Sequence, residues 1–98
     1  MEDIAQQTKW IERLYAEGER LNVPSHTLKT LVDYVANRVP TGGFLHAVLT
    51  NDLIETMGRA DHINREHIHD ICSFVYNWLP ANCWHSEEAV KRWLERKE

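Results

Sequence analysis

The stretch from residue 40 to residue 53, PTGGFLHAVLTNDL, decides how the middle of the chain folds. Pro40 ends the preceding helix, and Thr41 is the expected N-cap of a new one, because apolar residues then recur at helical spacing. Glycines at a helix N-terminus can also hold an anion. Gly42 and Gly43 lack the lysine and the preceding strand of a nucleotide triphosphate loop, so the favoured interpretation is a tight turn into a buried helix.

Outward from this stretch, hydrophobic periodicity predicts an all-α fold, a compact bundle of about five helices joined by short turns. Residues 1–98 are expected to form a single helical domain, in which the segments after Pro24 carry most of the core and the more amphipathic first helix is a candidate to pack on a neighbouring subunit. The expected helices run over residues 3–20 with Asp3 as N-cap, from Pro24-Ser25 to Pro40, from Thr41 to Gly58, from Asp61 or Asn64 to Pro80, and from Ser86 onward.

Each predicted helix carries an apolar stripe that we expect to be buried. The third helix ends its stripe with Leu53 and Met57, and the fourth includes Cys72 as a small core residue. Asn51 and Asp52 lie at the border of the third stripe, where polar side chains need partners.

Composition narrows the function classes. The 98 residues include 11 Lys and Arg against 15 Asp and Glu, a net charge of −4, which argues against a DNA-binding protein. The expected third helix contains neither Lys nor Arg, so it does not suit a helix-turn-helix recognition element. An acidic, polar N-terminus and the absence of a long apolar run predict no membrane association and a cytoplasmic location.

Metal binding and nucleophilic catalysis find little support in the sequence. His62, Glu66 and Asp70 follow each other at four-residue spacing, which we interpret as a solvated polar face, and we predict no metal and no cofactor. Cys83 precedes Trp84-His85 at the start of the last helix, but no triad surrounds it. The chain is therefore interpreted as a binding protein more than as an enzyme.

Several polar and aromatic residues favour a pocket for a flat, polar ligand. In this hypothesis the amides at the glycine entrance and Arg59 bind a phosphate, while an aromatic ring stacks on a base. The alternative is a structural network in which Arg59 forms an ion pair with Asp52 or Asp61. The candidate ligand-binding residues are Gly42, Gly43, Asn51, Asp52, Arg59, Asp61, Tyr76 and Trp84.

Three motifs together resemble a group of small proteins encoded by bacteriophages and prophages: PTGGFLHAVLTNDL, then GRADHIN, then FVYNWLPANCWHSEEAVKRWL. The resemblance covers residues 23 to 94 and leaves the first helix outside. His85 departs from the pattern, which has glycine there. The resemblance implies an accessory protein that acts on the host cell, including by blocking its defences, and implies no catalytic residues.

The leading hypothesis is a non-enzymatic, homo-oligomeric protein of phage type that sequesters a small nucleotide-like signal in the host cytoplasm. The alternative is an inhibitor that binds a host protein through an exposed apolar or aromatic surface, with the motif residues structural. A third hypothesis is that the chain is a small hydrolase that uses Asp52, Asp61 or the histidines.

Overall fold

The structure is a computed structural model that describes residues 4–96, with side chains from residue 8 onward. Over these residues it is all-helical, as predicted, with seven α-helices where about five were expected. The helices are α1 Ile4–Arg20, α2 Ser25–Asn37, α3 Gly43–Leu49, α4 Leu53–Arg59, α5 His62–Arg65, α6 Ile68–Trp78 and α7 Glu87–Glu95, and the 3₁₀ turn η1 spans Ala81–Cys83.

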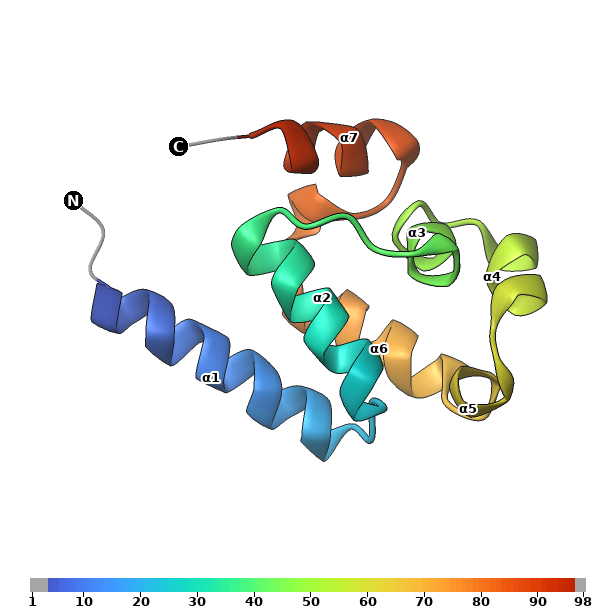
Figure 1. The fold of residues 1–98 in the computed structure, drawn as a ribbon, viewed down its shortest axis with the longest axis horizontal. Helices are drawn as coiled ribbons and strands as arrows, with labels where there is room; N and C mark the ends of the chain where they lie inside the picture. The colour runs from blue at the N-terminus through green and yellow to red at the C-terminus, as the bar shows by residue number, and fades with distance from the viewer. Residues whose placement is uncertain (1–3, 97–98) are drawn as a thin grey trace.

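The helices form a compact body whose radius of gyration, 13.0 Å, is that expected for a folded chain of about 100 residues. Helix α1 lies antiparallel beside α2 and also contacts α6, while α3, α4 and α5 gather at one end of the molecule (Figure 1). Helix α7 closes the side opposite α1 (Figure 1). Within the described part of the chain, no helix has the length and apolar character needed to cross a membrane.

The core lies between α1, α2, α3, α6 and α7, and Tyr34 of α2 is at its centre. Its buried hydroxyl donates a hydrogen bond to the carbonyl oxygen of Cys83 at 2.6 Å. Its own carbonyl accepts a hydrogen bond from the indole Nε1 of Trp93 at 3.1 Å. Both partners lie beyond α6, so this one residue joins η1 and α7 to α2.

The helix predicted from Thr41 to Gly58 is two helices, and the break falls at Asn51-Asp52. Asn51 has a φ of 65°, in the left-handed region that ends α3, and Asp52 is the N-cap of α4. The Asp52 carboxylate accepts a hydrogen bond from the backbone N–H of Glu55 at 3.3 Å. These two residues are therefore turn and cap residues, where the sequence predicted the border of one continuous apolar face.

Two further details of this predicted helix were wrong. The N-cap of α3 is Gly42, and the Thr41 hydroxyl donates instead to the Gly42 carbonyl at 3.3 Å. Gly58 lies inside α4, which continues to Arg59, so it does not terminate the helix.

The predicted fourth helix is likewise divided, into α5 and α6. Asp61 is a cap, as expected, because its carboxylate accepts from the backbone N–H of Asn64 at 2.7 Å. Asn64 itself lies within α5 and caps nothing. Cys72 was predicted to be a core residue but is exposed on α6. The buried thiol is that of Cys83.

The other helix boundaries follow the sequence more closely. Ser86 caps α7 as predicted, accepting from the backbone N–H of Ala89 at 3.1 Å. Helix α2 ends at Asn37, three residues before Pro40, because Arg38 has a left-handed φ of 58°. The expected cap Asp3 lies outside the described residues.

Two glycines in helices have opposite surroundings. A Cβ atom at Gly18 of α1 would overlap the side chain of Leu28, which is fully buried on α2. A Cβ atom at Gly58 of α4 would meet no atom within 4 Å. Gly18 therefore permits the close contact of α1 with α2, whereas Gly58 only lowers the helix propensity of α4.

We predict opposite stability changes for the two alanine substitutions. Gly18→Ala should lower the free energy of unfolding by about 1–3 kcal/mol, because the buried Leu28 side chain has no free space to enter. Gly58→Ala should raise it by about 0.5–1 kcal/mol through helix propensity. Urea denaturation followed by far-UV circular dichroism measures both, and equal stabilisation by the two variants would contradict the packing argument.

Candidate functional site

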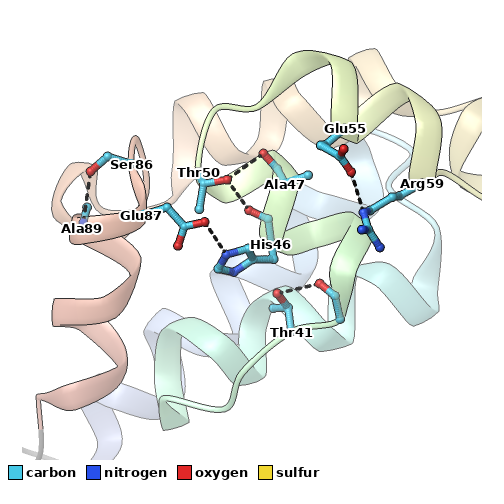
Figure 2. Close-up of polar contacts among 10 residues, drawn as sticks. Thr41, His46, Ala47, Thr50, Glu55, Arg59, Ser86, Glu87 and Ala89 are labelled. Carbon is cyan, nitrogen blue, oxygen red and sulfur yellow. Dashed lines mark hydrogen bonds and ion pairs between the residues drawn. The ribbon is translucent and has the colours of Figure 1, made fainter.

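A groove of about 430 Å³ lies at the start of α3 and contains four of the predicted site residues, Gly42, Gly43, Asp52 and Arg59. Figure 2 shows the polar side chains around it, with His46 directed toward Glu87 of α7 and Arg59 beside Glu55 of α4. The sequence hypothesis that Arg59 reaches the glycine entrance agrees with this arrangement. The remaining lining residues are Thr41, His46, Ala47, Thr50, Glu55 and Glu87.

Gly43 allows Arg59 to approach the backbone of α3. A Cβ atom at Gly43 would lie 3.0 Å from Nη1 of Arg59, closer than ordinary van der Waals contact. A Cβ atom at Gly42 would meet nothing within 4 Å. Only the second glycine of the pair is therefore explained by a close approach.

The groove carries more negative than positive charge. Arg59 is paired through Nε with Glu55 at 2.7 Å, so the predicted ion pair with Asp52 or Asp61 is wrong. Glu55 precedes Arg59 by one helical turn, which makes it the nearer carboxylate. With Asp52 and Glu87 the groove holds three carboxylates against one guanidinium.

A side-chain contact between a histidine and a carboxylate at the rim of the groove joins two helices. His46 Nε2 of α3 lies 3.0 Å from a carboxylate oxygen of Glu87 in the first turn of α7. Both side chains are substantially exposed, so this contact adds little to stability. It marks the place where α7 borders the groove.

Asp61 lines a second hollow, of about 380 Å³, on the other side of the glycine pair. Its carboxylate is engaged in capping α5, as described above. Nearby, the hydroxyl of Thr27 donates to the side-chain oxygen of Asn64 at 2.6 Å. The polar groups of this hollow thus already bond one another, and Phe44, Leu45 and Ile63 supply much of its apolar lining.

The remaining predicted residues, Asn51, Tyr76 and Trp84, meet in a third, smaller pocket of about 170 Å³. The rings of Tyr76 and Trp84 are in edge contact, with centroids 6.1 Å apart. Trp84 also stacks on His85, with centroids 4.2 Å apart and planes 8° from parallel. Within the described chain, the buried indole Nε1 of Trp84 has no hydrogen-bond partner.

The candidate residues therefore form separate sites, and α3 lies between two of them. Ala47 and Thr50 line the groove with Arg59, whereas Val48 and Asn51 line the pocket with the aromatic rings. A ligand phosphate bound at Arg59 would thus lie in a different hollow from the ring meant to stack on its base.

The thiols and histidines show no arrangement typical of a reaction centre. Cys83 is fully buried, and burial raises the pKa of its thiol to about 12, so the thiolate form is disfavoured at neutral pH. His67 Nδ1 lies 3.0 Å from a carboxylate oxygen of Asp70. Among residues 4–96 no three His, Cys, Asp or Glu side chains are grouped so that they could hold a metal ion.

The sequence prediction missed an apolar surface on α4. Leu53, Ile54 and Met57 have exposed fractions of 66%, 78% and 53%, although Leu53 and Met57 were predicted to be buried. Thr56 is the buried residue of this helix, and its hydroxyl donates to the carbonyl of Asp52 at 2.7 Å. Helix α4 is therefore inverted relative to an ordinary amphipathic helix: a hydroxyl is buried, and the large apolar side chains are exposed to solvent.

Comparison of this chain with protein-family models, with curated proteins and with solved structures finds no match.

The role of Asp52 as a cap can be tested directly. Asp52→Ala should lower the free energy of unfolding by about 0.5–2 kcal/mol, because the first turn of α4 loses its acceptor. Asp52→Asn should keep most of that stability, since asparagine caps almost as well as aspartate. Thermal unfolding of the two variants decides, and equal losses would show that Asp52 acts through its charge.

Proposed function

We propose that this chain is a non-enzymatic binding protein that engages another protein through the exposed apolar face of α4. We call this surface, made by Leu53, Ile54 and Met57, the α4 face. The observation that carries the proposal is the inversion of α4, in which only Thr56 is buried. In the phage context that the sequence resemblance implies, the partner is a host protein.

The α4 face has the pattern of a helix that binds in a groove. Its three side chains are spaced i, i+1 and i+4 and so share one side of the helix. Arg59 and Glu55 lie on the other side, toward the groove at the start of α3. Burying a Leu, Ile or Met side chain releases about 1.5–3 kcal/mol, so a partner that covers the α4 face gains substantial free energy.

The α4 face is also held in place without using its apolar side chains. An isolated helix as short as α4, which has seven residues, is marginal in water. Here the Asp52 cap and the buried hydroxyl of Thr56 fix its first turn. The apolar side chains are thus free for binding, and the surface is preorganised, which lowers the entropic cost of association.

The test compares two double variants, one on the α4 face and a control that removes two exposed apolar side chains elsewhere. Ile54→Ser with Met57→Ser should leave the melting temperature within a few degrees of wild type, because both residues are exposed. The same variant should lose at least about tenfold in affinity for a bacterial protein captured by the wild type and then purified. The control, Trp10→Ser with Val39→Ser, should bind as the wild type does.

Two results would overturn the proposal. One is unchanged affinity of the Ile54→Ser, Met57→Ser variant for the captured protein. The other is a wild-type dimer in light scattering that only this variant converts to monomers, since the α4 face would then belong to a second copy of the chain.

Sequestration of a small nucleotide-like ligand is the second candidate function. The observation that favours it is the close approach of the Arg59 guanidinium to the backbone at Gly43. Among the described residues, Arg59 is paired only through Nε, which leaves its terminal nitrogens available to a phosphate. Three carboxylates in the same groove oppose a phosphate, and the aromatic rings line another pocket. These two facts place this function second.

Calorimetry against cyclic dinucleotides and ADP-ribose derivatives tests the sequestration function. It expects saturable heat with one ligand class, lost in Arg59→Gln and kept in Arg65→Gln, a matched arginine on α5. Heat that persists unchanged in Arg59→Gln, or no heat with any ligand of the panel, would eliminate this function.

A further inference from the structure

A cluster of arginines surrounds Trp93 near the end of α7, far along the chain from the α4 face. Arg38, at the end of α2, places its guanidinium carbon 3.8 Å from the centroid of the Trp93 ring. The guanidinium carbon of Arg96 lies 5.7 Å from the same centroid. This protein carries a net charge of −4, so a concentration of positive charge is unexpected.

Arg38 makes two hydrogen bonds to backbone carbonyls in this cluster. Its Nε donates a hydrogen bond to the carbonyl oxygen of Arg96 at 3.1 Å, and Nη1 donates to that of Val35 at 3.5 Å. Arg38 also occupies a left-handed backbone conformation, with φ of 58°, where glycine or asparagine is usual. Arginine therefore occupies a position whose backbone conformation favours glycine, and its side chain makes the contacts with Trp93 and Arg96 described above.

Beside this cluster is a pocket of about 450 Å³, lined by Asn82, Arg92, Trp93, Glu95 and Arg96. Arg92 and Arg96 are exposed and one helical turn apart. Within residues 4–96, neither has a carboxylate within 4.0 Å, although four other Arg and Lys side chains of this chain are paired with carboxylates. Two guanidiniums and one amide thus border an open hollow.

The helix dipole explains only part of this arrangement. Cations near the C-terminus of a helix are favourable, which accounts for Arg92 and Arg96 on α7. It does not account for Arg38, which comes from α2, nor for Asn82, which comes from η1. The hollow is lined by groups from η1 and α7, and Arg38 of α2 lies over the Trp93 ring that borders it. Polar groups that converge from separate elements on one hollow are typical of a binding site.

We propose that this pocket binds a phosphate group. Arg92 and Arg96 donate to its oxygens, the Asn82 side chain adds an amide donor, and Arg38 supplies a third positive charge behind the Trp93 ring. Guanidinium groups match phosphate oxygens in geometry and in charge. Two lining arginines, with Arg38 behind the Trp93 ring, outweigh the single carboxylate of Glu95 and favour a dianion over a singly charged carboxylate.

The pocket is suited to the phosphate and not to an attached base. The Trp93 ring is only 7% exposed, one face is covered by Arg38, and its indole N–H is bonded to the Tyr34 carbonyl. The ring therefore cannot stack on a base.

The phosphate comes either from the free ion or from a phosphorylated residue of a peptide, and the two sources are separated in the test.

Titration of isotope-labelled protein, followed by NMR, tests the site. Sodium phosphate should shift the Asn82 side-chain amide and the Trp93 indole N–H signals saturably, while sodium chloride at the same ionic strength should not. Arg92→Gln with Arg96→Gln should weaken phosphate binding by about tenfold or more. The control, Arg65→Gln with Lys91→Gln, removes the same charge and should weaken it less than about twofold.

The outcomes separate clearly. Equal shifts with chloride, or equal losses in the two double variants, would overturn the site. If the double variant unfolds, the single Arg92→Gln variant replaces it, because Arg92 is exposed and its substitution is expected to leave the fold intact. A phosphoserine peptide that binds more tightly than free phosphate assigns the group to a peptide, and equal affinity assigns it to the free ion. Neither result depends on the α4 face, whose variants should bind phosphate normally.

Discussion

Two hydrogen bonds of Tyr34 determine how the last third of the chain joins the rest. Its hydroxyl donates to the Cys83 carbonyl and its carbonyl accepts from Trp93, and all these groups are buried. A buried polar group left without a partner costs about 1–3 kcal/mol, so η1 and α7 can dock on α2 in only one register. The same docking buries the Cys83 thiol, so the thiol is inaccessible to reactants. It also brings Trp93 under Arg38, at the edge of the arginine cluster.

How far the sequence predicts this structure depends on whether the prediction rests on hydrophobic periodicity or on helix-capping residues. Periodicity correctly predicts an all-α fold, and Ser86 is recognisable as a cap because a polar residue precedes Glu87 and an apolar stripe. The break at Asn51-Asp52 has a signal too, because aspartate three residues before Glu55 is typical of a helix start. The apolar residues on both sides continue at helical spacing, however, and that continuity concealed the break.

For the candidate site, the sequence predicts which residues lie close together but not how these groups are arranged relative to one another. The sequence brings Gly43 together with Arg59, and Tyr76 together with Trp84, and each pair does lie close together in the structure. It cannot place the two pairs relative to each other, because that depends on which residues of α3 face each hollow. Val48 and Asn51 face the aromatic rings, whereas Ala47 and Thr50 face Arg59. The body of α3 therefore separates what the sequence predicted as a single site.

The exposure of Leu53, Ile54 and Met57 was unpredictable for a related reason. Periodicity identifies the apolar side of a helix, but it does not reveal whether another element covers that side. In a chain of 98 residues, whose stability is of order 5–15 kcal/mol, leaving three such residues in solvent forgoes a considerable part of the available burial. The hydroxyl of Thr56 and the Asp52 cap hold α4 instead, so its orientation does not depend on the apolar side chains. Substitution on the α4 face can therefore change binding while the Tyr34-centred core stays intact.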